Sequence, residues 1–335
     1  MQIITDLQKY KHRSRCPIVL ALGNFDGFHL GHQKLVQYVI RQAKKERGLA
    51  AVLTFRQHPH SILHPERKPM MLMSVEHKLM YLEQAGVDLC FLQSFTPAFS
   101  EMTPQSFVEG ILVNKLHIRE ICMGYDAHFG HGREGNTRLM ERLAQDKGFL
   151  FKKMKPVLCG GKPVSSSRIR EHLVRGDVTD AGRCLGRPFS MLGTVIHGKG
   201  HGHELGFPTA NLEVHSEILL PLGVYIASGR FVILKKKKAG ISVGKVSPWF
   251  PGVMNFGKRP TYPKIETPRP VLELHLLDFK GEVYGKTMEI ALHRFLRPEK
   301  KFHGEENLKA AIAEDVQTAR RYYHNQAGKV LFKYS

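Results

Sequence analysis

The order of apolar runs along the first half of the chain is the feature that most narrows the possible folds. Between residues 18 and 157, short apolar runs alternate with segments of helical periodicity, a pattern typical of βαβ units around a mostly parallel sheet. Residues 18–22 predict a buried strand, and residues 35–43 predict an amphipathic helix. Further strands are expected at 51–55, 89–92 and 118–123. This half is therefore predicted to be a Rossmann-like α/β domain.

The character of the chain changes near Cys184. Beyond it, glycine and proline are frequent and short β-type runs replace the helical patterns, which predicts an antiparallel barrel or sandwich. From Glu305 onward, Leu308, Ile312 and Val316 lie on one face of an expected C-terminal helix. A length of 335 residues is enough for two cores. We therefore expect two domains, residues 1–184 and 185–335.

The net charge of +20 is unusual and points to polyanionic partners. This charge is compatible with several anionic partners: nucleotides, phosphate esters, nucleic acid and acidic membranes. The densest basic run, at 235–238, is expected to be a solvated hairpin turn. No apolar run approaches the roughly 20 residues that span a bilayer, and the N-terminus lacks a secretory pattern. A cytoplasmic chain without a membrane partner is the resulting expectation.

A glycine-rich segment at residues 23–32 follows the first predicted strand and opens the first predicted helix. Its glycines, at 23, 27 and 31, allow the backbone to approach phosphates, and a helix N-terminus attracts anions. His29 and His32 can face one pocket and stabilise negative charge on departing pyrophosphate. The alternatives are a surface coincidence or an incomplete metal site.

A second polar segment lies at residues 164–170, where three serines precede Arg168 and Arg170. The serines can cap the helix that they open. The two arginines can instead clamp a phosphate. Both interpretations are compatible with the sequence.

A third motif lies in the second half, where a strand leads into a glycine-rich loop. The loop glycines that allow close approach to phosphates are Gly198, Gly200, Gly202 and Gly206. Thr209 and Asn211 follow with neutral oxygens suited to Mg²⁺. Further on, Glu273 interrupts an apolar strand, where it can be a catalytic base or a solvated carboxylate.

These motifs resemble prokaryotic bifunctional riboflavin kinase/FAD synthetases. The resemblance rests on residues 23–32, the Ser-Ser-Ser-Arg-Ile-Arg run at 165–170, the segment 124–136 and the Pro-Thr-Ala-Asn run at 208–211. It implies an α/β nucleotidylyltransferase domain, related to class I aminoacyl-tRNA synthetases, followed by an antiparallel β-barrel riboflavin kinase domain with a C-terminal helix. Residues 252–261 and 296–302 also follow the family pattern, so the resemblance covers nearly the whole chain.

The resemblance implies a set of roles in the nucleotidylyltransferase domain. His29, His32 and Arg168 are implied to be catalytic. The implied ATP site consists of Gly23, Phe25, Gly27, His29, His32, Ser166, Ser167 and Arg168. The implied flavin contacts are Phe55, His58, Pro59, Asp126 and Phe129. Gln57 stands where this family usually has proline.

In the kinase domain, the resemblance implies that Thr209 and Asn211 bind Mg²⁺ and ATP beside the glycines of the loop. Glu273 would accept the proton of the ribityl 5′-hydroxyl. Residues 201–203 read His-Gly-His where the family commonly has arginines, and histidine titrates near neutral pH.

The implied reactions are riboflavin + ATP to FMN + ADP, and then FMN + ATP to FAD + pyrophosphate, both with Mg²⁺. The expected partners are these small molecules and not nucleic acid, while the oligomeric state is left open. Two alternatives remain at this point. One of the two domains can be inactive, or the chain can be a basic nucleic-acid-binding or regulatory protein that retains a nucleotidyltransferase fold.

Overall fold

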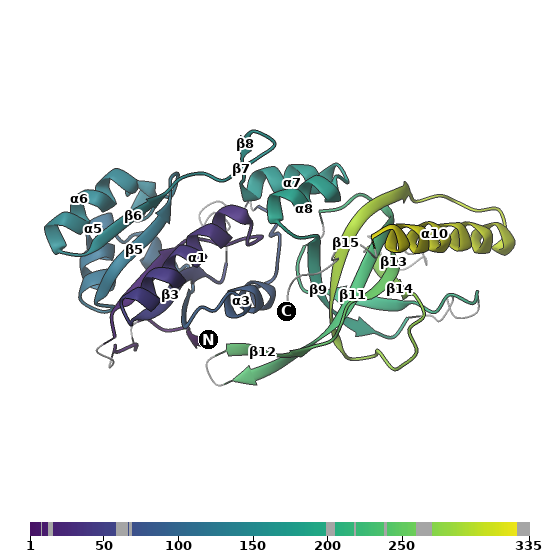
Figure 1. The fold of residues 1–335 in the computed structure, drawn as a ribbon, viewed down its shortest axis with the longest axis horizontal. Helices are drawn as coiled ribbons and strands as arrows, with labels where there is room; N and C mark the ends of the chain where they lie inside the picture. The colour runs from purple at the N-terminus through teal and green to yellow at the C-terminus, as the bar shows by residue number, and fades with distance from the viewer. Residues whose placement is uncertain are drawn as a thin grey trace. The chain divides into compact units, whose positions relative to one another are not determined.

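A computed structural model describes residues 1–7, 9–12, 16–57, 66, 69–198, 205–217, 219–237, 240–258 and 270–326. The chain divides into two compact units, drawn in Figure 1. The first contains residues 1–166 and 234–243, and the second contains residues 167–233 and 244–335. The border expected at 184/185 falls inside the second unit, within its second helix (Val178–Leu185).

The first unit is built on a sheet of six strands in the order β1-β4-β3-β2-β5-β6, in which every pairing is parallel. The strands are β1 (Gln2–Ile4), β2 (Ile18–Leu22), β3 (Leu49–Phe55), β4 (Leu89–Gln93), β5 (Ile118–Gly124) and β6 (Leu150–Met154). The predicted parallel sheet is confirmed. Because β3 and β5 flank β2 on opposite sides, the chain reverses its direction of winding at β2.

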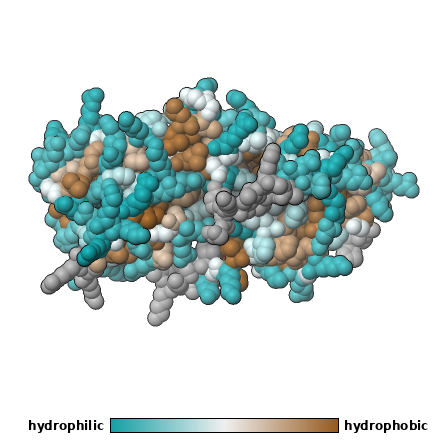
Figure 2. All heavy atoms as spheres, in the orientation of Figure 1, coloured by the Kyte–Doolittle hydropathy of each residue, from teal (hydrophilic) through white to brown (hydrophobic). Residues whose placement is uncertain are grey.

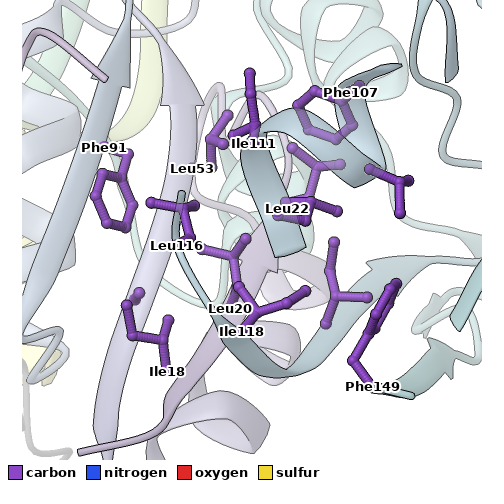
Figure 3. Close-up of a cluster of buried hydrophobic side chains, with 14 of the residues drawn as sticks. Ile18, Leu20, Leu22, Leu53, Phe91, Phe107, Ile111, Leu116, Ile118 and Phe149 are labelled. Atoms are coloured by element: carbon purple, nitrogen blue, oxygen red, sulfur yellow. The ribbon is translucent and has the colours of Figure 1, made fainter. Parts of the chain in front are cut away.

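Helices pack on this sheet as the apolar periodicity requires. Helix α1 (Leu30–Lys45) buries Leu35, Val36, Val39 and Ala43 and packs on β2, β3 and β5. Figure 3 shows part of the core, including Leu20, Leu22 and Leu53 from the strands. Burying each such side chain contributes about 1.5–3 kcal/mol. The predicted helix is therefore confirmed by the face that it buries.

The remaining elements of the first unit are short. They are α3 (Val75–Gln84), α4 (Pro97–Ser100), α5 (Pro104–Ser106), the π-helix η2 (Phe107–Val113), the 3₁₀ turn η3 (His131–Arg133), α6 (Thr137–Lys147) and the hairpin β7 (Leu158–Cys159) with β8 (Lys162–Pro163). Helix α7 (Ser166–Val174) then begins at the last residue of this unit.

The second unit contains α7, α8 (Val178–Leu185) and an antiparallel barrel. The strands are β9 (Phe189–Ile196), β10 (Ala210–Val214), β11 (Gly223–Lys237), β12 (Gly240–Val246), β13 (Phe250–Lys258), β14 (Pro270–Leu276) and β15 (Thr287–Pro298). They follow the order β12-β11-β13-β14-β10-β9-β15, and an additional pairing of β11 with β15 closes the barrel. The predicted barrel is confirmed.

The lysine run at 235–238 differs from the prediction. Strand β11 extends to Lys237 and β12 starts at Gly240, so three of the four lysines continue a strand instead of forming a turn. The ladder with β12 supplies the backbone hydrogen bonds that make this extension possible.

The C-terminal helix α10 (Glu305–Gln326) packs on the barrel as predicted. Val316 and Ala319 are buried against Val224, Ile226 and Val253. Polar contacts fix the helix as well. Arg297 pairs with Asp315 at 2.7 Å, and the hydroxyl of Tyr323 donates to the carbonyl of Ala227 at 2.5 Å.

The surface is mainly hydrophilic on the face shown in Figure 2, where hydrophobic residues gather in separate small patches. Among the described residues, the exposed large hydrophobic side chains are Met70, Tyr125, Leu150, Leu158, Val174, Ile233, Val246 and Tyr284. Of the helices that the structure describes, none combines the length and apolar character needed to cross a bilayer.

Candidate active sites

The glycine-rich segment 23–32 lies at the carboxyl end of β2, the central strand of the parallel sheet. Ligands of open α/β sheets bind outside the carboxyl ends of the strands, at the point where the winding reverses. The strand order places that point at β2. The loop therefore occupies the position in the first unit where this topology favours a nucleotide.

The backbone of this loop is held in uncommon conformations. Phe25 has φ +52° and Phe28 has φ +41°, values that side-chain-bearing residues rarely adopt. Phe25 is completely buried, and Phe28 stacks on Tyr81 with ring centroids 6.1 Å apart. Such strain persists only where the surroundings over-determine it, and it concentrates at functional sites. The two buried rings supply that constraint.

The two predicted histidines are brought together at the start of α1. His29 caps the helix, and its Nδ1 accepts from the N–H groups of Gly31 at 3.2 Å and His32 at 3.4 Å. The two imidazole rings stack with centroids 3.7 Å apart. Because Nδ1 of His29 is used as an acceptor, its ring proton sits on Nε2 and can be donated to a ligand.

The serine segment also reaches this loop. Ser166 Oγ donates to the carbonyl of Asp26 at 2.9 Å, across a sequence separation of 140 residues. Ser167 and Arg168 follow on α7 in the second unit, where Ser167 is exposed and Arg168 is half-buried. The structure therefore joins one of these three predicted residues to the loop of the first unit.

The loop also rests on a buried polar cluster that the sequence analysis did not single out. Lys78 on α3 is 1% exposed and donates to the carbonyl of Phe55 at 2.9 Å. Asp26 is equally buried, and its carboxylate accepts from the N–H of Leu72 at 3.0 Å. The available signal was a lysine next to the apolar residues 79–82 of the helix.

The predicted flavin contacts lie at the ends of the neighbouring strands. Phe55 ends β3 and makes edge contacts with Phe95 and Phe99. Asp126 follows β5 and is exposed, whereas Phe129 is buried with its ring 5.8 Å from that of Phe107. His58 and Pro59 lie outside the described residues. The side chain of Asp126 is thus accessible to a ligand, whereas the ring of Phe129 packs in the hydrophobic core.

In the second unit, strand register brings the third motif and Glu273 together. Asn211 on β10 lies directly opposite Glu273 on β14, and Glu273 lies opposite Asn255 on β13. Directly opposed residues share one face of a sheet. Leu272 and Leu274 are buried on the other face, so Glu273 is half-buried outside the apolar interior. The three polar residues, Asn211, Glu273 and Asn255, form a row, called here the polar row.

Two glycines fit closely against this polar row. A Cβ on Gly198 would overlap the amide of Asn211, and one on Gly257 would lie 2.6 Å from Glu299 Oε1 and 3.3 Å from Asn255 Nδ2. Alanine at Gly198 would therefore displace the amide of Asn211, whereas at Gly257 the overlap falls on the end of the flexible Glu299 side chain. Asn255 and Gly257 were not singled out, although they lie in a run that follows the family pattern, because the sequence does not reveal strand register.

For the other residues predicted at the second site, the structure describes Thr209 and Gly206 but not the centre of the loop. Thr209 is half-buried directly before β10, and Gly206 is exposed with φ +85°. Gly200 and Gly202 lie outside the described residues, as do His201 and His203.

Comparisons with known proteins match both units. The FAD synthetase family model matches residues 11–168, and the riboflavin kinase family model matches residues 185–323. A crystal structure described as a macrolide-efflux protein from Streptococcus pneumoniae is similar with a TM-score of 0.79 and 24% identity, covering 95% of this chain and 98% of that one. At that identity the likeness shows the fold alone.

Three relatives share the printed name bifunctional riboflavin kinase/FMN adenylyltransferase. The protein from Haemophilus influenzae is 34% identical, with 97% of this chain and 100% of the relative covered. The one from Escherichia coli K12 is 32% identical, with 96% and 98% covered, and the one from Listeria monocytogenes is 35% identical, with 91% and 92% covered. The chain therefore belongs to the family of bifunctional riboflavin kinases/FMN adenylyltransferases.

Proposed function

We propose that the two activities of this family are divided between the two units, with the loop 23–32 as the site of adenylyl transfer and the polar row as the site of riboflavin phosphorylation. The chain makes FMN from riboflavin and ATP, and FAD from FMN and a second ATP. The observation that carries the assignment is the direct opposition of Asn211 and Glu273, which joins two motifs that lie far apart in the sequence.

In the first unit, an oxygen of the FMN phosphate attacks the α-phosphorus of ATP, and pyrophosphate leaves. Nε2 of His29 and the ring of His32 stabilise the charge that develops on the leaving group, together with the partial positive charge at the N-terminus of α1. Ser166 holds the same phosphates, while Gly23, Phe25 and Gly27 shape the loop. Ser167 and Arg168, the next two residues in the sequence, stay predicted contacts of these phosphates. Phe55, His58, Pro59, Asp126 and Phe129 are the proposed flavin contacts.

In the second unit, Glu273 takes the proton of the riboflavin 5′-hydroxyl as that oxygen attacks the γ-phosphorus, and ADP leaves. A carboxylate half-buried beside two amides is positioned by its neighbours without being sealed from substrate. The loop containing Gly198, Gly200, Gly202 and Gly206 lets the backbone approach the phosphates of ATP.

The donors at this site also suit Mg²⁺. The hydroxyl of Thr209 and the amide oxygen of Asn211 are hard oxygen ligands, which Mg²⁺ prefers. When bound, the ion neutralises charge on the transferred phosphate. Asn211 is 7% exposed and fixed by the ladder on both sides, so it would hold such an ion with little rearrangement.

We include small molecules alone as partners in this proposal. The charge of +20 attracts ATP and FMN, both anions, without requiring nucleic acid. A gel-shift assay with duplex DNA and RNA at physiological salt should show no retained complex. The cytoplasm, where ATP is available, is the proposed location.

The decisive experiment incubates the purified chain with riboflavin, ATP and Mg²⁺ and separates FMN and FAD by chromatography. His32→Ala should abolish FAD formation but keep FMN formation, with a loss of about 10²- to 10³-fold. Glu273→Gln should abolish FMN formation but keep adenylylation of supplied FMN, because an amide cannot accept the proton. The activity that each variant keeps shows that its chain is folded. Full FAD synthesis by the first, or full FMN synthesis by the second, would refute the corresponding site.

A further inference from the structure

A buried ammonium group lies beneath the loop of the first unit. Lys78 donates to the carbonyl of Phe55 at 2.9 Å and lies 3.5 Å from the hydroxyl of Thr54. That hydroxyl in turn donates to the carbonyl of Asn24 at 3.1 Å. A chain of hydrogen bonds thus runs from α3, through the end of β3, to the backbone of the loop.

A buried carboxylate in the loop completes the arrangement. Asp26 is 1% exposed and interacts electrostatically with Lys78. Its carboxylate oxygens accept from the N–H of Leu72 at 3.0 and 3.3 Å, and its carbonyl accepts from Ser166. One residue therefore ties the loop to the segment before α3 and to the start of α7.

Placing an ammonium group in this environment is costly. The desolvation penalty of a buried ion amounts to several kcal/mol, and apolar side chains of similar volume often replace buried charges without loss of stability. A methionine would fill the same space beside Leu79 and Met80. Stability alone is thus a poor reason for a lysine here, whereas a loop with two phenylalanines at positive φ needs a firm anchor.

We propose that Lys78 is a positioning residue for adenylyl transfer, whose ammonium group fixes Asp26 and Asn24 and so holds the loop 23–32 in the geometry that receives the phosphates of ATP. This inference rests on the proposed function of that loop. Lys78 is too deeply buried to touch the substrate, so it acts through the backbone. Displacing a reacting group by about 1 Å can cost about 10²-fold in rate.

The role predicts a pH dependence. Burial lowers the pKa of Lys78 from 10.5 to about 8, partly opposed by attraction to Asp26 on the loop, and Cys90 on β4 is the other titratable group that acts on it. Burial raises the pKa of Cys90 to about 12, so this thiol stays neutral over the range concerned. FAD formation should therefore fall as the pH rises through about 8, while the ammonium group loses its charge.

The test uses the full chain with Lys78→Met and Lys78→Arg, and with Lys45→Met on the exposed end of α1 as the matched control. FAD formation from FMN and ATP is measured between pH 6 and 10, and FMN formation from riboflavin is the internal control. Lys78→Met should lose about 10²-fold in kcat with little change in the KM for ATP, and its residual rate should not fall near pH 8. Lys78→Arg keeps its charge, so its alkaline fall should disappear or move upward.

Parental kcat in Lys78→Met would overturn the proposal, as would an alkaline fall near pH 8 that Lys78→Arg shares with the parent. If Lys78→Met does not fold, the pH profile of Lys78→Arg decides alone. Failure of the proposed function looks different, because the parent chain would then make no FAD. Lys45→Met should match the parent in both reactions.

Discussion

A single glycine leaves the space that the side chain of Asn211 occupies at the second proposed site. Gly198 stands so close to Asn211 that a Cβ would overlap the amide. We predict that Gly198→Ala displaces Asn211 and lowers kcat/KM of riboflavin phosphorylation by about 10²-fold. Adenylylation of supplied FMN should not change. Gly110→Ala is the control, because nothing lies within 4 Å of the added atom there. Steady-state kinetics showing normal phosphorylation in Gly198→Ala would mean that Asn211 does not need its present position.

A buried histidine makes the second unit sensitive to acid. His293 is 8% exposed, its Nε2 lies 3.0 Å from Ser228 Oγ, and burial lowers its pKa from 6.5 to about 4. Between pH 6.5 and 4 the unfolded chain binds a proton that the folded barrel does not, so stability falls as the pH falls through this window. The shift corresponds to roughly 3 kcal/mol.

Thermal unfolding of the parent and of His293→Gln between pH 4 and 7 measures this effect. The parent should lose stability toward pH 4 more steeply than the variant, because glutamine does not titrate. The carboxylates of the chain protonate in both proteins, so the difference between the two curves isolates His293. If the stabilities of the two proteins fall in parallel with pH, protonation of His293 does not destabilise the folded barrel.

Helix α8 belongs structurally to the barrel, although it precedes the first barrel strand. It buries Val178, Ala181, Cys184 and Leu185 and packs on β9 and β15. We predict that a fragment of residues 167–335 is more stable than one of residues 185–335. The shorter fragment lacks Val178, whose full burial alone corresponds to about 1.5–3 kcal/mol. Urea unfolding of the two fragments provides the measurement, and equal midpoints would contradict the prediction.

Elements with strong periodicity could be predicted from the sequence, and elements defined by their neighbours could not. Strand β2 and helix α1 bury the residues that their patterns single out. Strand β6, mostly exposed and with Lys152 and Lys153 at its centre, has no such pattern, and its place follows from pairing with β5. The same reason applies to the lysines of β11, which pairing with β12 keeps extended.

The residues of the two proposed sites also fall into those that the sequence predicts and those that it does not. The loop 23–32 could be predicted because its glycines and histidines are adjacent in the sequence. Asn255 could not, because its place beside Glu273 depends on the register of β13 and β14. The role of Lys78 could not be predicted either, because it depends on the electrostatic interaction with Asp26, which lies on another element. Contacts between distant segments are thus the part that the sequence leaves open.

At the scale of the whole molecule, the proposed sites fall in different units. The loop 23–32 and Ser166 belong to the first unit, and the polar row belongs to the second. Each unit also has its own buried core, Leu20 and Phe91 lying in the first and Ile226 and Val316 in the second. Separate cores are the physical condition for independent folding.

We therefore predict that the two activities can be separated and recombined. A fragment of residues 1–184, which keeps Ser166, Ser167 and Arg168, should adenylylate FMN, and a fragment of residues 167–335 should phosphorylate riboflavin. Neither should convert riboflavin to FAD alone, but the mixture should, with free FMN passing through solution. Chromatography of the products from each fragment and from the mixture checks this. Phosphorylation that disappears in the second fragment and returns on mixing would show that its site needs residues of the first, and would refute the division. Exposed apolar residues of α8 in the first fragment can lower its stability, so its activity is the quantity that decides.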